Sequence, residues 1–446
     1  MSDLLSIGAS GIKAYSRALA TVSDNIANSQ TPGYARRTIQ LEEARASGDL
    51  VLYRNNLRPG GVTIGGVVRA VDDWLIADSR VASGDASRNS ARLEWMNITE
   101  RALDDGGDGI GTNMTAVFTA ADQLSANPND ATLRAEFLQA VDSTASAFQR
   151  TAVGLQSAAA GISTDAQTSV NQVNNDLAAL QRVNDGLLRS RDGSTNAATL
   201  LDERDRLIDQ ISSSIGVVAS FDAHGVASLR AAGPGGETLL NGPVIAALSV
   251  TTAPDGRIGF GITPSATGIL MPVTGSLAGL ADAANVVADR RVELDSLAIS
   301  FANDMNASHQ AGLDANGAAG LALFNLGAGA ATLTAAALSP DQVAAGDATS
   351  VNGNILAFGG LRGPNGSEAG WAALASAHAQ ATAAARAQEA ASSVRRDGAF
   401  EARNDASEID LDREAADLLR FQQAYEAAAR TIQVARETMQ TIFNIF

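Results

Sequence analysis

The sequence predicts a mainly α-helical, elongated, multidomain protein with a small inserted β domain. Three observations lead to this prediction. Apolar residues recur every seven positions near both ends of the chain, which is the pattern of a coiled coil. Long proline-free stretches between the ends carry apolar residues at helical spacing, which predicts a helical bundle as the middle domain. In residues 216–274 the apolar spacing changes to every second residue and is interrupted by turn residues, as in short strands.

The first expected helix covers residues 3–29 and ends where Pro32 and Gly33 interrupt the helical pattern. Its apolar residues form one heptad row and a second, offset row that begins at Gly8. A glycine weakens a helix but lets another backbone approach closely. The predicted interface residues on this helix are Leu5, Ile12, Tyr15, Leu19, Val22 and Ile26.

The last expected helix covers residues 411–446, which contain neither Pro nor Gly. Its two heptad rows include Glu414 at a position that is otherwise apolar. A long apolar stripe needs a partner, because alone it would be an exposed patch. We therefore expect the two ends to pair as an antiparallel or mixed coiled coil; two ordinary core helices of a bundle are the alternative. The predicted interface residues here are Leu411, Leu418, Phe421, Tyr425, Ile432, Met439, Ile442 and Phe446.

The segments between these ends follow from turn residues and periodicity. An extended hairpin segment is expected over 36–71, and Asp255-Gly256 predicts a hairpin turn inside the β domain. The charges of Leu200–Asp209 are expected on the solvated side of a helix. Residues 327–366 are rich in Gly and Ala and predict weak order. Helices are expected over 72–104, from about 112 to the break at 127–130, over 133–183, from 200, over 275–308 and over 367–404.

The three predicted domains combine these segments. The terminal coiled-coil domain comprises 1–35 and 405–446. The helical middle domain comprises 36–215 and 275–404 and includes the extended hairpin segment. The small inserted β domain comprises 216–274.

Composition excludes several classes of function. A formal charge of −17 argues against binding nucleic acid, whose phosphates require a basic surface. The absence of cysteine excludes disulfides and thiol chemistry, and no apolar window is long enough to span a membrane. His309 and Asp314 are close in sequence, but no second histidine or carboxylate cluster accompanies them. No catalytic, cofactor-binding or metal-binding residue is therefore predicted, and no cofactor.

Three motifs carry a resemblance to a known family. The segment Asn25–Tyr34 closely resembles the N-terminal signature of the bacterial flagellar rod, hook and hook-associated proteins. Residues 35–38 resemble the hook-associated protein 1 form of that signature. The spacing N-x-x-H-x-x-G-x-D-x-x-G-x-x-G over 306–320 resembles hook-associated protein 1 specifically. So does Leu200–Asp209, with Arg204 and Asp205 in matching places.

The resemblance implies a structural subunit, not an enzyme, at the hook–filament junction of the flagellum. The partners it implies are further copies in a helical or ring assembly, the hook protein, a second junction protein next to the filament, and an export chaperone on the C-terminal helix. It implies extracellular location by flagellar type III export, and the N-terminus lacks the features of a cleaved signal. The alternatives are a rod or hook axial protein and a flagellum-borne hydrolase.

Overall fold

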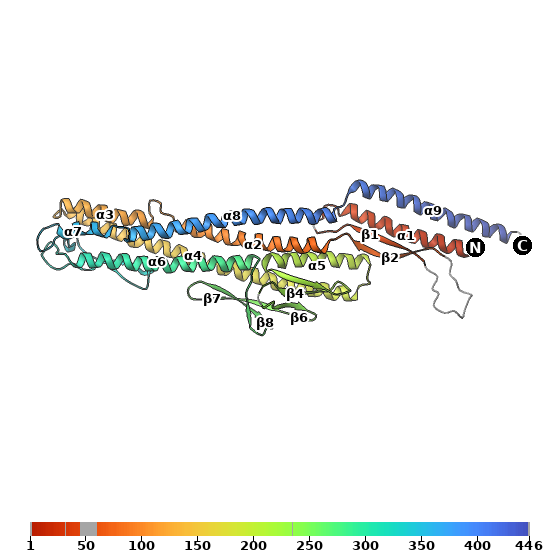
Figure 1. Ribbon diagram of the computed structural model, residues 1–446, viewed down its shortest axis with the longest axis horizontal. Helices are drawn as coiled ribbons and strands as arrows, with labels where there is room; N and C mark the ends of the chain where they lie inside the picture. The colour runs from red at the N-terminus through yellow and green to blue at the C-terminus, as the bar shows by residue number, and fades with distance from the viewer. Residues whose placement is uncertain (1, 32, 45–59, 234, 445–446) are drawn as a thin grey trace. The chain divides into compact units, whose positions relative to one another are not determined.

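The computed structural model describes residues 2–31, 33–44, 60–233 and 235–444, and helices dominate it (Figure 1). The mainly helical fold class with inserted β strands is thereby confirmed. The chain divides into two compact units. The first unit comprises residues 1–84, 173–247 and 394–446, and the second comprises 85–172 and 248–393. The three predicted domains divide the chain differently, and their boundaries stay predictions.

The first unit contains the two terminal helices, α1 (Ser2–Ala27) and α9 (Leu411–Phe443). It also contains α5 (Thr195–Ser214), the first residues of α2 (Asp73–Ala102), and the last residues of α4 (Ala131–Arg189) and α8 (Ser367–Ser407). The expected helices are thus present, although α4 extends to Arg189 and not 183, and α5 begins at Thr195 and not 200.

The expected extended segment forms an antiparallel hairpin of β1 (Arg37–Glu43) and β2 (Val62–Arg69), with a bulge between Gln40 and Leu41. Gly66 lies against Gly193: a Cβ on Gly66 would come within 3.1 Å of the Gly193 backbone. The amide of Val67 donates to the Gly193 carbonyl at 2.8 Å. This close backbone approach requires glycine at both positions.

The strands expected within 216–274 are present but form two sheets. Strands β3 (Val217–Phe221), β4 (Ala227–Ala231), β5 (Thr238–Asn241) and β6 (Val244–Ile245) form an antiparallel sheet in the first unit. Strands β7 (Ala247–Thr252), β8 (Ile258–Thr263) and β9 (Ile269–Leu270) form a second sheet. The predicted turn at Asp255-Gly256 joins β7 to β8, with Gly256 at φ +94°.

The second unit has a phenylalanine-rich core. It contains α3 (Ile110–Ala126), α6 (Ser276–Gln310), and parts of α2, α4 and α8. Phe301 lies between Phe148 and Phe324, with ring centroids 6.0 and 5.4 Å away, and Phe137 meets Phe358 edge-on at 5.8 Å. All five side chains are buried, and each contributes about 1.5–3 kcal/mol through burial alone.

The expectation of weak order over 327–366 is wrong. This segment contains β11 (Thr334–Ala335), which pairs with β10 (Phe324–Asn325), the short helix α7 (Gly353–Ala357), and 3-10 turns at Ala330–Thr332, Pro340–Gln342 and Phe358–Leu361. Side chains from helices hold the segment: Arg134 of α4 donates to the carbonyls of Pro340 and Val343 at 3.2 and 2.8 Å. Contacts from distant helices order a stretch whose own sequence has little preference for regular structure.

His309 and Asn306 explain the 306–320 motif. His309 is fully buried; its Nδ1 bonds to the Leu321 carbonyl at 2.6 Å, and its Nε2 accepts from the Ala344 amide at 2.8 Å. Asn306 accepts from the Leu323 and Phe324 amides at 2.7 and 2.8 Å. These residues therefore hold backbone together, and no group of metal-binding side chains exists among the residues that the structure describes.

Candidate assembly interface

The terminal helices α1 and α9 pack side by side in antiparallel orientation (Figure 1). A Cβ on Gly8 would come within 2.6 Å of Ile432, and Tyr15 faces Phe421 with ring centroids 6.5 Å apart. Near the other end of the pair, Asn25 meets Glu414 at 3.0 Å. Residue numbers therefore rise along one helix as they fall along the other. Of the antiparallel and mixed arrangements that the heptads allowed, the pair has the antiparallel one.

Small residues form the seam of α1 toward α9. The buried residues of this helix are Gly8, Gly11, Ala14, Ala18, Thr21, Val22 and Asn25. The predicted offset row, with Gly8 and Val22, lies in this seam. The predicted companion row of Leu5, Ile12, Leu19 and Ile26 is only half-buried, because the seam passes one position earlier, through residues 11, 18 and 25. The residues of this seam row are too small or too polar to stand out as an apolar heptad row in the sequence.

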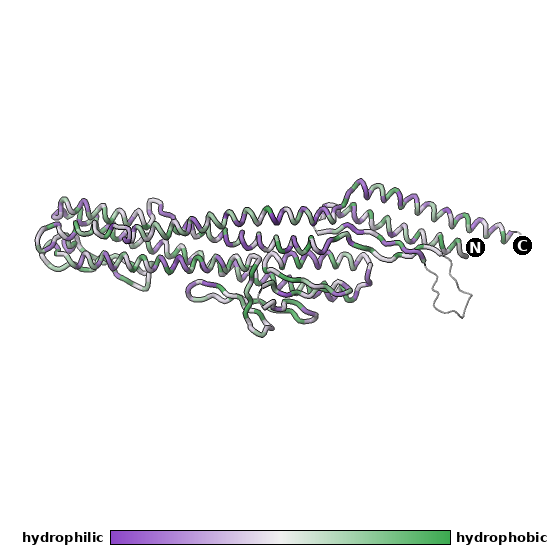
Figure 2. Tube along the Cα trace, in the orientation of Figure 1, coloured by the Kyte–Doolittle hydropathy of each residue, from purple (hydrophilic) through white to green (hydrophobic). Residues whose placement is uncertain are grey.

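On α9 the structure gives the predicted interface residues two different environments. Leu418, Phe421, Ile432 and Met439 are half-buried. Leu411, Tyr425 and Ile442 are exposed. Phe446 lies outside the described residues. Among the α9 residues whose burial is described, Glu414 and Ala435 are fully buried, and both belong to the second predicted row. Figure 2 shows apolar and polar residues interspersed along both helices. Of the apolar residues, Leu4 and Ile7 of α1 and Leu419 and Val434 of α9 are exposed.

Asn25 and Glu414 form a polar lock where the helix pair meets the hairpin. Asn25 donates to Glu414 and to the Arg37 carbonyl, and it accepts from the Arg37 amide and the Tyr34 hydroxyl, all at 2.8–3.0 Å. Arg36 donates to the second oxygen of Glu414 at 2.7 Å. Burial raises the pKa of Tyr34 to about 12, so its hydroxyl stays a donor at neutral pH.

This lock gives the Asn25–Tyr34 signature a structural reason. Asn25 uses both its donor and its acceptor, and Glu414 is 0% exposed with both oxygens bonded. A buried carboxylate needs such partners, because an unpaired one costs several kcal/mol. An acidic residue at an apolar heptad position was the signal in the sequence, and its partners lie almost 400 positions away in the chain.

Three aspartates on α5 form a ladder with arginines from four other elements. Asp202 bonds to Arg37 of β1 and Arg69 of β2 at 2.6 and 2.7 Å. Asp205 also binds Arg69, at 2.7 Å. Asp205 also pairs with Arg80 of α2 and with Arg204 of α5. Asp209 pairs with Arg80 and with Arg403 of α8.

The charges of Leu200–Asp209 were expected to face solvent. That expectation is wrong for the charged residues of this segment that take part in the ladder. Arg204 and Asp205 are buried, because arginines from other segments supply partners for this side of the helix. Burial alone would raise the pKa of Asp205, but the charges of Arg204, Arg69 and Arg80 hold it below its usual value. The residues that carried the resemblance thus fasten the hairpin and helix ends of the first unit together.

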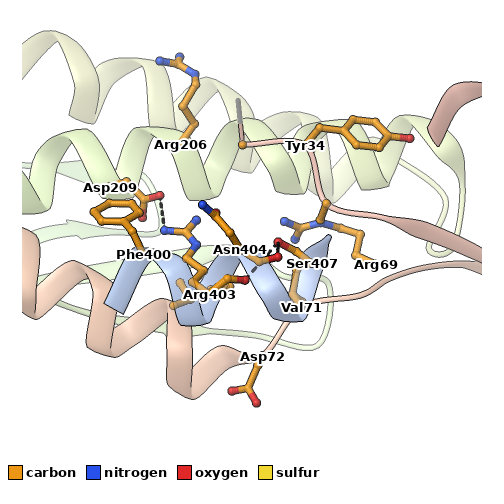
Figure 3. A pocket seen from close by; sticks show the side chains of 13 residues that line it. Tyr34, Arg69, Val71, Asp72, Arg206, Asp209, Phe400, Arg403, Asn404 and Ser407 are labelled. Atoms are coloured by element: carbon orange, nitrogen blue, oxygen red, sulfur yellow. Dashed lines mark hydrogen bonds and ion pairs between the residues drawn. The ribbon is translucent and has the colours of Figure 1, made fainter. Parts of the chain in front are cut away.

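A cavity of about 240 Å³ lies beside this ladder (Figure 3). Its walls include Tyr34, Val71, Phe400, Asn404 and Ser407. The charged side chains that line it are already engaged: Arg69 and Arg403 with ladder aspartates, Arg206 with Glu203, and Asp72 with backbone amides. The charged side chains of its lining therefore already have partners among the described residues. None of the helices that the structure describes is long and apolar enough to cross a membrane.

Comparison with known families gives matches along most of the chain. The family described as "Flagellar hook-associated protein FlgK helical domain" matches residues 96–324. The family "Flagella basal body rod protein" matches residues 5–34, and "Flagellar basal body rod FlgEFG protein C-terminal" matches residues 404–445. The last two matches coincide with the terminal helices and the polar lock.

Individual relatives carry the same names. Flagellar hook-associated protein 1 of Salmonella typhimurium is 29% identical over 337 residues, covering 73% of this chain and 60% of its own length. The protein of that name in Bacillus subtilis is 23% identical over 500 residues, covering 97% and 96%. The solved flagellar hook junction protein FlgK from Burkholderia pseudomallei shares the fold with a TM-score of 0.50 at 22% identity, over 56% of this chain and 47% of that one. The chain thus spans about 60% of the length of the Salmonella relative.

Proposed function

This chain belongs to the family of the flagellar hook-associated protein FlgK, and we propose that it is a structural subunit of the hook–filament junction that polymerises through its terminal helices. The observation that carries the proposal is the construction of the α1–α9 pair. Its seam consists of small residues, while Leu4, Ile7, Leu411, Leu419 and Val434 remain exposed. Apolar side chains left outside a seam favour packing against further copies.

The proposed partners follow from this role. Further copies pack in a helical or ring assembly, the hook protein contacts the junction on one side, and a second junction protein contacts it toward the filament. Before assembly, the apolar α9 is the segment that an export chaperone would cover. The proposed route is flagellar type III export, ending in the extracellular part of the flagellum.

A strain lacking this chain tests the proposal directly. We expect hooks without attached filaments in electron micrographs, and attachment restored by the native gene. Filaments attached normally in the deletion strain would contradict a junction role. Loss of the hooks themselves would favour the rod or hook axial alternative. Cleavage of casein or peptidoglycan by the pure protein, abolished by one point mutation, would revive the hydrolase alternative.

Leu418→Asp tests the terminal helices themselves. Leu418 is half-buried in the α9 rows that face α1, and a charge placed there meets a desolvation cost of several kcal/mol. We expect this variant to be exported and yet to restore no filament attachment. Ala416→Asp, at an exposed position of the same helix, is the matched control and should restore it. Attachment by both variants would show that the terminal pair is not the assembly element.

A further inference from the structure

Trp74 stands out at the start of α2 because its side chain is 71% exposed. Asp72 fixes the backbone beneath it, accepting from the amides of Trp74 and Leu75 at 2.9 and 3.1 Å. Asp73 is exposed and has no ion-pair partner among the described residues. Val71, also exposed, precedes them. We call Val71, Asp73 and Trp74 the Trp74 knob: an exposed indole beside a carboxylate that has no ion-pair partner among the described residues.

A hollow of about 370 Å³ is lined by residues of α9 and by Leu4 of α1. Small side chains leave it open, since Ala427, Thr431 and Ala435 follow one another along one face of α9. Val434 and Arg430 stand beside them, and Leu4 of α1 closes one side. Arg430 is exposed and has no ion-pair partner within the described part of the chain. We call these six residues the α9 hollow.

The knob and the hollow are complementary in size and charge. A cavity of this volume admits a side chain as large as indole between apolar walls. The guanidinium of Arg430 at its edge suits two features of the knob: it can lie over the indole face as a cation–π contact, and it can pair with the Asp73 carboxylate. Opposite charges beside an apolar plug and its socket specify one orientation of docking.

One chain cannot make this contact with itself. Val71, the first residue of the knob, and Asp72 lie beside Asn404 and Ser407, just before α9 begins (Figure 3). The hollow begins at Ala427, sixteen residues into α9, or about 24 Å along a helix at 1.5 Å per residue. The occupant of the hollow must therefore come from another molecule.

We propose that the Trp74 knob of one copy docks into the α9 hollow of a second copy. A patch that meets a different patch on its partner is a heterologous contact, and it leaves each copy with one unused knob or hollow. Such a contact repeats until it closes a ring or extends a helix. This inference rests on the proposed function, since it names the surfaces through which the copies polymerise.

Cysteine cross-linking tests the contact, because the native chain contains no cysteine. Cells would co-express Asp73→Cys and Arg430→Cys chains, which keep both the indole and the apolar hollow. After oxidation of isolated hook–filament structures, we expect a disulfide-linked dimer from the mixture and none from either variant alone. Dimers of Asp73→Cys alone would mean that knobs meet knobs, and would overturn the proposal.

A charge exchange supplies the second measurement and guards against a variant that fails to fold. Asp73→Arg and Arg430→Asp should each lower filament attachment at least tenfold, and the double variant should recover most of it. Trp74→Ala should lower it likewise, whereas Val394→Ala, which removes another highly exposed apolar side chain of the same unit, should not. Unchanged attachment in Trp74→Ala, or no recovery in the double variant together with no mixed dimer, overturns the proposal.

The test separates this contact from the proposed function. Loss of attachment in Trp74→Ala without any mixed dimer would assign the knob to a different flagellar protein, which overturns self-docking and leaves the junction role intact. A native chain absent from isolated hook–filament structures would instead refute the junction role itself.

Discussion

The terminal helix pair and the core of the second unit are stabilised in different ways. The α1–α9 seam contains Gly8, Gly11, Ala14 and Ala18, and its largest ring contact joins Tyr15 and Phe421, both only half-buried. The second unit buries Phe137, Phe148, Phe301, Phe324 and Phe358 in α4, α6 and the segment after α6. Hydrophobic stabilisation grows with the apolar area removed from water. We therefore expect the core to be the more stable of the two regions, and the terminal pair to need neighbouring copies for its full burial.

Amide hydrogen exchange on the soluble monomer gives the largest expected contrast. Amides of the α4 and α6 core should exchange only through global unfolding, with protection of roughly 5–15 kcal/mol. Amides of 5–26 and 411–443 should exchange orders of magnitude faster, because a long helix pair without a deep core is marginal. Equal and strong protection of both regions at high dilution would remove the contrast.

Phe301→Ala should cost the second unit about 3–5 kcal/mol, since it empties a site between two other rings. Urea denaturation followed by circular dichroism measures the loss. Ile299→Ala, at a partly exposed position of the same helix, is the matched control and should cost far less. A cost below 1 kcal/mol for Phe301→Ala would show that the core can collapse around the gap.

Glu414→Ala should loosen the terminal pair by about 2 kcal/mol, because it leaves Asn25 and Arg36 without their buried partner. The expected readout is faster exchange of α1 amides near Asn25, with the α6 amides unchanged. Glu426→Ala removes an exposed carboxylate from the same helix and should change neither. Equal exchange in the two variants would show that the polar lock adds nothing to the apolar seam.

Acid should weaken the second unit through His309. Burial lowers the pKa of His309, so the folded protein keeps the ring neutral while the unfolded chain takes up a proton near pH 6.5. The stabilisation is complete above pH 6.5 and falls below it by up to about 1.4 kcal/mol per pH unit. Urea midpoints at pH 7.5 and 5.5 measure this loss.

His309→Asn is the comparison for that measurement. The variant should be less stable at pH 7.5 and should lose less between the two pH values. His378, whose pKa burial also lowers, is present in both proteins and contributes equally. Identical pH dependence in the two proteins would mean that the His309 ring is not held neutral by the fold.

Local signals in the sequence predicted most of the elements and few of their contacts. Pro32, Gly33 and the spacing of apolar residues located the helix ends, because turn chemistry and periodicity act over a few residues. The seam of α1 was displaced by one position, since glycine and alanine carry the contact there. Whether the predicted interface residues contact other copies stays a prediction.

Two of the errors, the charges of α5 and the order of 327–366, share one physical cause. The burial of Arg204 and Asp205 depends on Arg69 and Arg80, which lie more than 100 positions away in the chain. The order of residues 327–366 depends on Arg134 and His309 in the same way. A charge pattern read along one helix cannot distinguish a solvated side from a side whose counter-ions arrive from other segments. The sequence did not predict the α9 hollow, because a gap between small residues produces no periodic pattern of apolar residues.

The arginine–aspartate ladder on α5 has a consequence for the medium in which the protein works. At 0.1 M salt, dissolved ions largely screen the interaction between exposed charges that are more than about 10 Å apart. They screen the interaction within a buried pair much less. Arg37, Arg69 and Arg80 are each less than a tenth exposed where they meet their aspartates. The stabilisation that these buried ion pairs provide should therefore be similar at low and high salt concentration. Contacts made by exposed charges weaken as the salt concentration rises.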